Sequence, residues 1–142
     1  MPLTTQEKRS QLETVPLFGD CSSEVLDRLA EVTAEIAFGA DAPIVQQGQV
    51  GNGLYIVVSG GARIVAGSDE LARLGPGDFF GELSVIDQRP RAASAFAVGD
   101  THCLALASWD LMAVLKQEPQ LATNLLKELA SRLRAADAQL RH

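Results

Sequence analysis

Gly-Asp-Phe-Phe-Gly-Glu-Leu-Ser-Val-Ile-Asp-Gln-Arg-Pro-Arg-Ala-Ala-Ser, residues 77–94, is the stretch that decides what this chain folds into. Phe79 and Phe80 are expected to end a strand and to anchor it in the core. Gly81 then permits a sharp turn. Residues 82–86 can form one helical turn whose unpaired N–H groups point back toward the glycine, and a helix start of this kind attracts anions.

The second half of this stretch supplies a cation beside that turn. Pro90 forces an extended backbone, and Arg91 follows it with a planar fork of donors that suits phosphate or carboxylate oxygens. Ala92 and Ala93 are small enough to let a ligand approach the backbone, and Ser94 adds a hydroxyl. The combination predicts a pocket for a small phosphate.

Outward from this stretch, the middle of the chain is punctuated by glycine. Eleven of the twelve glycines lie between residues 39 and 99. Glycine marks tight turns, and short apolar or alternating runs separated by turn signals are typical of a β-sandwich or barrel. The runs that we expect to be strands are residues 44–46, 54–58, 62–66, 71–74, 93–98 and 103–107.

The flanks of this middle section are helical in pattern. Residues 23–33 place apolar side chains at helical spacing, and Ser22 or Ser23 can cap the start of that helix. A second helix is expected to start near Ser108, which can cap residues Trp109–Lys116. Pro119 fits the first turn of a final helix that reaches about Leu140.

Composition limits the classes of function. The chain has 142 residues, 46% of them hydrophobic, and a net charge of −6, which is the balance of one globular domain. An acidic chain repels nucleic-acid phosphates, so no direct nucleic-acid partner is expected. No membrane span and no secretory signal are expected, and the two distant cysteines fit reduced thiols in the cytoplasm.

No catalytic motif accompanies the predicted phosphate pocket, and we expect no enzyme activity. The sequence lacks the Gly-rich loop that ends in Lys-Ser/Thr, the Gly-x-Ser-x-Gly turn and the His-Glu-x-x-His helix. Two histidines, His102 and His142, cannot build the histidine-rich metal site of a cupin, so neither a metal nor a cofactor is expected.

Residues 79–94 resemble the phosphate-binding cassette of cyclic nucleotide-binding domains. The family pattern is Phe-Gly-Glu-Leu-(Ala/Ser), a spacer, then Pro-Arg-(Ala/Thr)-Ala-(Thr/Ser), and it stands here as residues 80–84 and 90–94. The resemblance extends to residues 47–60, with a glycine turn, a tyrosine strand and a Ser-Gly turn, and to Leu-Gly-Pro-Gly-Asp at 74–78. It covers the chain from about Leu17 to the C-terminus.

The resemblance implies a mainly β fold with flanking helices. We expect an antiparallel, jelly-roll-like β-roll with an N-terminal helix and two C-terminal helices. The chain would be a single domain, residues 1–142. Residues 1–14 would be an arm or helix, 34–107 the β-roll with its cassette at 79–94, and 108–141 the C-terminal helices.

The resemblance also implies roles for individual residues in binding a cyclic nucleotide. Arg91 would pair with the cyclic phosphate, and Glu82 would accept a hydrogen bond from the ribose 2′-hydroxyl. The remaining expected ligand-binding residues are Gly81, Leu83, Ser84, Ala92 and Ser94, through ribose space, backbone N–H groups or a hydroxyl. In the family, threonine after the cassette arginine tends to favour the guanine nucleotide; Ala92 stands here, so cyclic AMP is expected, with cyclic GMP the alternative.

The resemblance leaves the output open. We expect a sensor whose C-terminal helices move on binding, with Leu83 or Ile86 repacking against the final helix. Receptor-type transcription factors of the family continue into a helix-turn-helix domain, which we do not expect within a chain that ends at His142. The chain is either a whole protein or a regulatory piece of a larger one, and its effector protein is unknown. A degenerate domain that acts only in dimerisation or docking is the alternative.

Two features of the C-terminal part have two interpretations each. Trp109 is expected to anchor its helix on the barrel, with stacking on a nucleotide base as the alternative. The final helix repeats apolar residues at alternating three- and four-residue spacing: Leu126, Leu129, Leu133, Ala136 and Leu140. This short heptad seam fits either packing on the barrel or a homodimer through the helix.

Overall fold

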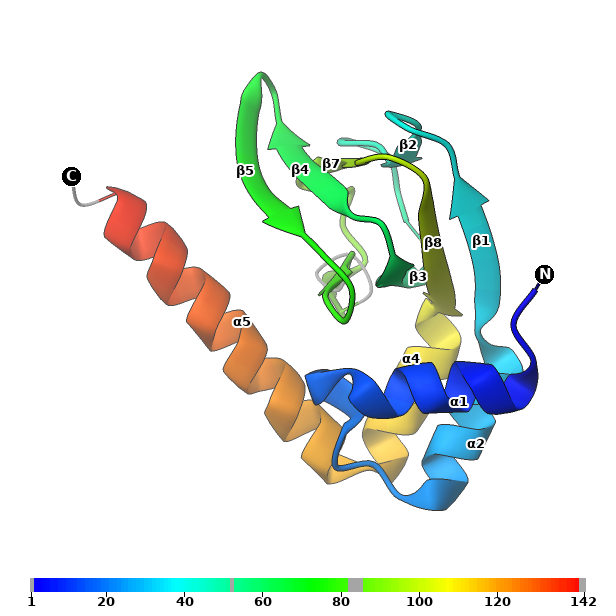
Figure 1. The fold of residues 1–142 in the computed structure, drawn as a ribbon. Helices are drawn as coiled ribbons and strands as arrows, with labels where there is room; N and C mark the ends of the chain where they lie inside the picture. The colour runs from blue at the N-terminus through cyan, green and yellow to red at the C-terminus, as the bar shows by residue number, and fades with distance from the viewer. Residues whose placement is uncertain (1, 52, 82–85, 141–142) are drawn as a thin grey trace.

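The computed structural model describes residues 2–51, 53–81 and 86–140. Two helices, α1 (Thr5–Thr14) and α2 (Ser23–Val32), and a short 3₁₀ helix η1 (Pro16–Phe18) precede the strands. The strands are β1 (Ala34–Phe38), β2 (Pro43–Val45), β3 (Gly53–Ser59), β4 (Ala62–Ala66), β5 (Asp69–Leu74), β6 (Phe79–Phe80), β7 (Ser94–Ala97) and β8 (Thr101–Ala107). Helices α4 (Ser108–Gln117) and α5 (Pro119–Leu140) follow them (Figure 1).

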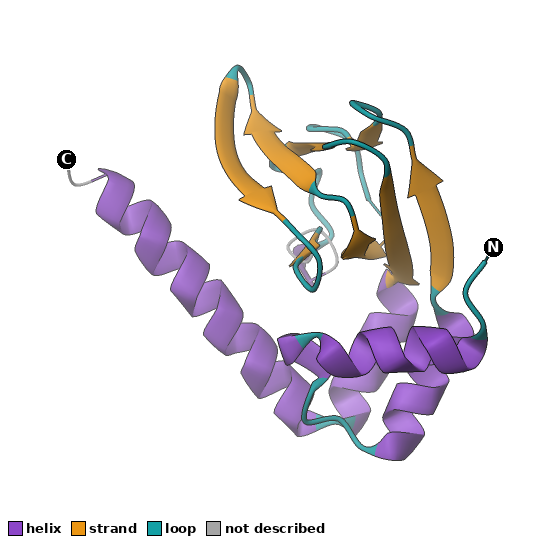
Figure 2. Cartoon of the chain, in the orientation of Figure 1, coloured by secondary structure: helices purple, strands orange, loops and turns teal. Residues whose placement is uncertain are grey.

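Within the described residues the strands form two four-stranded sheets, ordered β1-β8-β3-β6 and β2-β7-β4-β5. Neighbouring strands are antiparallel, as in the pairing of Leu54 with Leu106 and of Ile64 with Ala95. The two sheets face each other above a helical base that contains α1, α2 and α4 (Figures 1 and 2). The expected β-roll with an N-terminal helix and two C-terminal helices is confirmed.

Strand alternation divides the buried side chains into two cores. On β3, Leu54 and Ile56 face the helices and join a cluster that includes Phe18, Leu29 and Leu111. Alternate positions point into the roll, where Val57, Phe80 and Cys103 belong to a second, smaller cluster. Since successive side chains of a strand point to opposite faces, one sheet serves both cores.

Of the two predicted serine caps, one is confirmed. Ser108 does not cap α4, because it is the first residue of that helix and Ala107 occupies the N-cap position without a side-chain hydrogen bond. The Ser22 hydroxyl accepts a hydrogen bond from the Val25 N–H and caps α2, as expected. Helix α1 starts with a capping box between Thr4 and Glu7. No helix of the described chain is long and apolar enough to cross a membrane.

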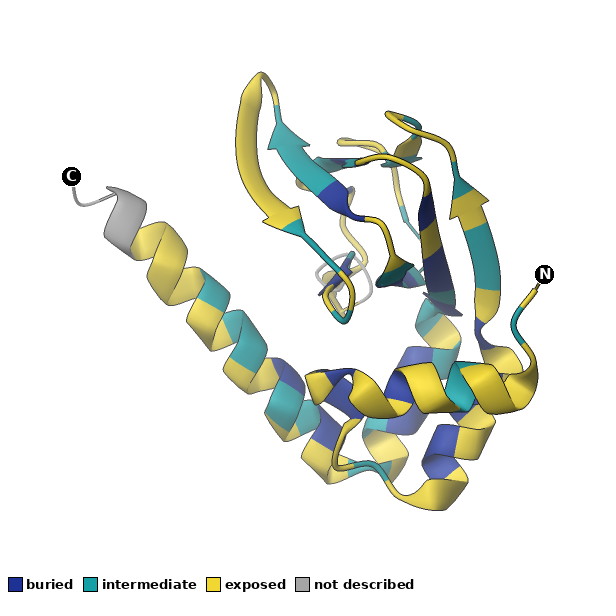
Figure 3. Ribbon diagram, viewed as in Figure 1, coloured by how far each residue is buried: buried dark blue, intermediate teal, exposed yellow. Residues whose placement is uncertain are grey.

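Helix α5 begins in the base and then leaves it. Leu121 and Leu125 near its start are buried among the other helices. Farther along, the helix runs beside the roll and its surface becomes exposed (Figure 3). Leu126 and Leu133 of the heptad seam are 67% and 71% exposed, so packing of these two residues on the barrel is wrong.

Candidate functional site

Arg91 is the centre of the site, and its backbone is fixed by the loop that follows β2. The Arg91 N–H donates to the Gln49 carbonyl at 2.8 Å, and the Gly48 N–H donates to the Arg91 carbonyl at 2.9 Å. Val50 and Pro90 form an isolated antiparallel bridge beside these bonds. The extended backbone that Pro90 imposes therefore pairs with this loop and turns the arginine side chain inward, where only 7% of it is exposed.

The guanidinium of Arg91 lies between two glycine carbonyls. Nη1 donates to the Gly81 carbonyl at 3.0 Å, and Nη2 donates to the Gly53 carbonyl at 2.9 Å. Gly81 belongs to the cassette and Gly53 starts β3, so one side chain connects two segments that are far apart in sequence. Two bonds to a planar group fix its orientation as well as its position.

Gly81 is required at its position for two reasons. Its φ of +94° lies in the region that side chains rarely adopt. A Cβ there would also lie 2.5 Å from Arg91 Nη1 and 2.9 Å from the Gly53 carbonyl oxygen. The glycine therefore keeps the chain turn and the guanidinium in contact.

The cassette enters the site from inside the roll. Phe80 stacks on Tyr55, with ring centroids 5.5 Å apart and ring planes 13° apart. Phe79 and Phe80 are both buried, as the sequence predicted. Because Gly81 follows directly, the aromatic packing of β6 sets where its carbonyl meets the arginine.

A cavity of about 430 Å³ reaches Arg91 from the edge of the roll. Among the described residues that line it, Arg91 is the one charged side chain, and most of the others are apolar. The cavity is lined by Val32, Ala34, Ile44, Val45, Gln46, Gln49, Val50, Gly51, Gly53, Tyr55, Arg91, Ala105, Leu106, Ala107 and Trp109. A largely apolar lining that presents the Arg91 cation suits a small ligand that joins an apolar part to a negative charge.

The other predicted site residues are only partly brought together. Gly81 contacts Arg91 directly. The Ser94 hydroxyl accepts from the Gln47 N–H at 2.8 Å, and Ala92 is exposed on the surface. Glu82, Leu83 and Ser84 lie outside the described residues, together with most of the predicted helical turn.

The prediction that Trp109 anchors its helix is wrong. Its side chain is 67% exposed and lies at the wall of the cavity. The buried face of α4 carries Leu111 and Val114 instead. A residue two positions before Leu111 points away from that face, because neighbours on a helix surface are three or four residues apart.

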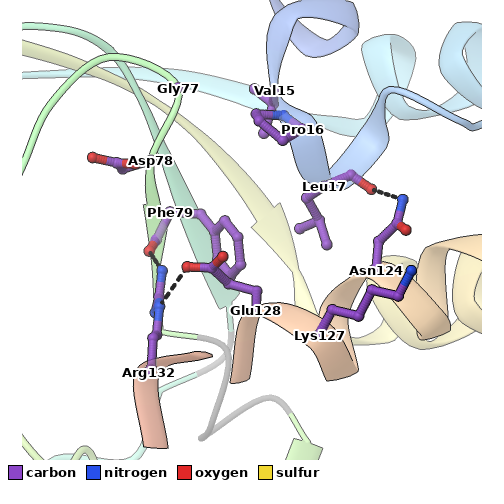
Figure 4. A pocket seen from close by; sticks show the side chains of 10 residues that line it. All are labelled: Val15, Pro16, Leu17, Gly77, Asp78, Phe79, Asn124, Lys127, Glu128 and Arg132. Carbon is purple, nitrogen blue, oxygen red and sulfur yellow. Dashed lines mark hydrogen bonds and ion pairs between the residues drawn. The ribbon is translucent and has the colours of Figure 1, made fainter. Parts of the chain in front are cut away.

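The structure adds one residue that the sequence reasoning missed, Arg132 of α5. Its Nη2 donates to the Phe79 carbonyl at 2.8 Å, and its guanidinium carbon lies 4.6 Å from the centre of the Phe79 ring. Its Nε also pairs with Glu128, one turn earlier, at 3.0 Å (Figure 4). The final helix is thereby attached to the first residue of the cassette.

This attachment closes one side of a second cavity, of about 260 Å³. Its walls come from η1 and the residues before it, from the turn before β6, and from α5 (Figure 4). The cavity therefore lies between the final helix and the elements on which that helix rests. Any shift of α5 relative to the roll would change its size.

Comparisons with known proteins agree with this architecture. The model of the cyclic nucleotide-binding domain matches residues 35–118. The chain is 41% identical to the cyclic AMP receptor protein of Thermus thermophilus over 130 residues, which is 88% of this chain and 60% of that protein. The chain thus spans about three fifths of the length of this relative.

Two solved structures are similar as well. The catabolite activator protein of Thermus thermophilus has a TM-score of 0.79 at 41% identity, over 89% of this chain and 62% of that one. The regulatory domain of Toxoplasma gondii PKA, solved with cAMP, has a TM-score of 0.77 at 28% identity, over 89% of this chain and 49% of that one. The roll, the cassette and the buried arginine, together with these matches, make this chain a member of the cyclic nucleotide-binding domain family.

Proposed function

We propose that this regulatory domain binds cAMP reversibly and signals by a movement of its C-terminal helices. The observation that carries the proposal is the buried guanidinium of Arg91, which donates to the carbonyls of Gly81 and Gly53 at the wall of a cavity where it is the one charged side chain among the described lining residues. A cyclic phosphate carries one negative charge, and one arginine in an apolar setting matches it. A charged hydrogen bond of this kind contributes about 1.5–3 kcal/mol.

The remaining cassette residues take the roles that the family motif gives them. Glu82 accepts from the ribose 2′-hydroxyl, and Gly81 leaves room for the ribose. Contacts to phosphate or sugar oxygens come from the backbone N–H groups of Leu83, Ser84 and Ala92 and from the hydroxyl of Ser94.

Two observations favour cAMP over cGMP. Ala92 occupies the position after the cassette arginine, where threonine tends to accompany the guanine nucleotide in this family. The Thermus relative is a cyclic AMP receptor protein, and the Toxoplasma structure holds cAMP. With about 22 heavy atoms at roughly 0.3 kcal/mol each, the expected Kd is about 10 μM or tighter.

The helix movement is supported by contacts that run from the ligand site to α5. Arg91 is bonded to Gly81, which directly follows Phe79 and Phe80, and Phe79 is held by Arg132 of the final helix. A ligand that repositions Arg91 or the cassette acts on this connection. Ile86 is 44% exposed and is free to repack against α5. In the proposal, Ile86 or Leu83 makes this contact when the ligand binds.

A docking or dimerisation module is the second candidate function. The observation that favours it is the exposure of Leu126 and Leu133 along one line of α5. A second copy of the helix could cover both, and such a homodimer is compatible with nucleotide binding. A module that has lost its ligand would keep this surface and lose the response to nucleotide.

Calorimetric titration with cAMP and cGMP tests the proposal and separates the candidates. We expect cAMP to bind with a Kd of about 10 μM or tighter, and cGMP to bind more weakly. If neither nucleotide gives a binding heat or a thermal shift, the proposed nucleotide binding is refuted and the docking or dimerisation module is the function that is supported. If the hydrogen-exchange rates of residues 108–137 are the same with and without cAMP, the helix movement is refuted.

A further inference from the structure

Gly51 lies against the guanidinium of Arg91 more closely than any side chain would permit. A Cβ built on Gly51 would be 2.0 Å from Arg91 Nε, 2.1 Å from Cζ and 2.2 Å from Nη2. Carbon atoms in ordinary contact are about 3.5–4.0 Å apart. The guanidinium thus occupies the space where a side chain at position 51 would begin.

The overlap at Gly51 involves the Arg91 side chain alone, whereas a side chain at Gly53 or Gly81 would also disturb the backbone. At Gly53 the nearest obstacle to a Cβ is the backbone carbonyl of Leu106, so a substitution there would disturb the pairing of β3 with β8. At Gly81 the left-handed φ adds backbone strain. At Gly51 the three nearest atoms all belong to Arg91, and the backbone φ is not left-handed.

The guanidinium has little freedom to yield. Its Nη1 and Nη2 are held at 3.0 Å and 2.9 Å from the carbonyls of Gly81 and Gly53. Relieving the overlap requires the side chain to move by more than about 1 Å. A movement of that size along either bond would take it beyond the range of about 2.7–3.2 Å in which N–H···O bonds form.

We propose that Gly51 is a positioning residue for Arg91: its missing side chain lets the guanidinium lie across the backbone of the β2–β3 loop, at the place where it meets the ligand's phosphate. The consequence for ligand binding rests on the proposed function. The placement of Arg91 itself is a property of the ligand-free protein. Any side chain at position 51 turns the guanidinium away from both carbonyls.

The test is a double-mutant cycle of Gly51→Ala with Arg91→Ala, and Gly75→Ala is the matched control. A Cβ at Gly75 meets nothing within 4 Å, and its φ is not left-handed. In thermal unfolding without ligand, we expect Gly51→Ala to lower the Tm by about 4 °C or more when Arg91 is present, because bonds of the guanidinium are lost. In the Arg91→Ala background it should behave like Gly75→Ala. An equal loss in both backgrounds would overturn the proposal.

Calorimetry with cAMP supplies the second measurement. Gly51→Ala should weaken binding by about tenfold or more, since displacement of a binding group by about 1 Å is costly. Gly75→Ala should stay within about twofold of the original chain. Full affinity in Gly51→Ala would overturn the role in binding. If the original chain binds no cyclic nucleotide, the proposed function fails, and the unfolding cycle still decides whether Gly51 positions Arg91.

Discussion

Replacing Arg132 with methionine should detach the outer half of α5 from the cassette. The substitution keeps an unbranched apolar chain and removes the guanidinium that bonds to the Phe79 carbonyl and covers the Phe79 ring. The inner half of the helix stays fixed by Leu121 and Leu125, which are buried. The expected effect is therefore a local loss of protection and not global unfolding.

The size of the effect follows from the contacts that are lost. A hydrogen bond from a charged group contributes about 1.5–3 kcal/mol, and an exposed cation–π contact adds about 0.5–1 kcal/mol. The pair with Glu128 adds about 0.3–0.5 kcal/mol, as exposed pairs one turn apart do. Because the Arg132 side chain is 34% exposed, the sum is discounted to about 2 kcal/mol, which is roughly a 30-fold rise in local opening.

Hydrogen exchange measured by mass spectrometry over residues 126–137 is the assay, and Arg134→Met is its control. Arg134 lies on the same helix, carries the same charge and is exposed. We expect faster exchange in Arg132→Met only, together with loss of the response of α5 to cAMP. Identical exchange in the two variants would refute the reasoning that Arg132 attaches the helix to the cassette.

Three further predictions concern the rest of the chain. The Leu3 N–H donates to the Glu35 carboxylate and lowers the pKa of that group. The stability that this hydrogen bond contributes is therefore present above the ordinary glutamate pKa of about 4.3 and is lost as the pH falls through the lower pKa of the folded state. The amide chemical shift of Leu3 in an NMR titration should report that lower pKa, and a midpoint at the ordinary value would contradict the prediction. Burial raises the pKa of the Cys103 thiol to about 11. A thiol reagent at pH 8 should therefore label Cys103 only in denaturant, and rapid labelling of Cys103 in the native protein would contradict this prediction. Leu133→Asp should convert a dimer into folded monomers in analytical ultracentrifugation, because Leu133 is 71% exposed in the single chain and packs little within it. An original chain that is already monomeric at high concentration would exclude this dimer.

Most of the β-roll could be predicted because its strands and turns are marked by residues within or next to them. Glycine turns and alternating side chains mark the strands between residues 43 and 107, and Ser22 marks the start of α2. Residues 34–38, which form β1, were not among the predicted runs. The sequence Ala-Glu-Ile-Ala-Phe follows α2 without a glycine or proline, and its partner β8 is distant in the chain.

The site was predictable in its chemistry and not in its geometry. The motif singles out Arg91, and the structure places that residue inside the roll. The sequence alone does not reveal that the guanidinium of Arg91 lies where a side chain of residue 51 would begin, because a glycine in a loop predicts only a turn. Nor does it reveal the bond between Arg132 and Phe79, which are 53 residues apart and meet only because of the direction in which α5 runs.

The most direct measurement of the central claim compares cAMP with adenosine, in the original chain and in Arg91→Gln, by calorimetry. Adenosine keeps the base and ribose and lacks the phosphate, so the difference between the two affinities isolates the phosphate. If Arg91 binds that group, the original chain should prefer cAMP by about 10- to 100-fold, as a charged hydrogen bond implies, and Arg91→Gln should lose nearly all of this preference. An undiminished preference in Arg91→Gln would contradict the account.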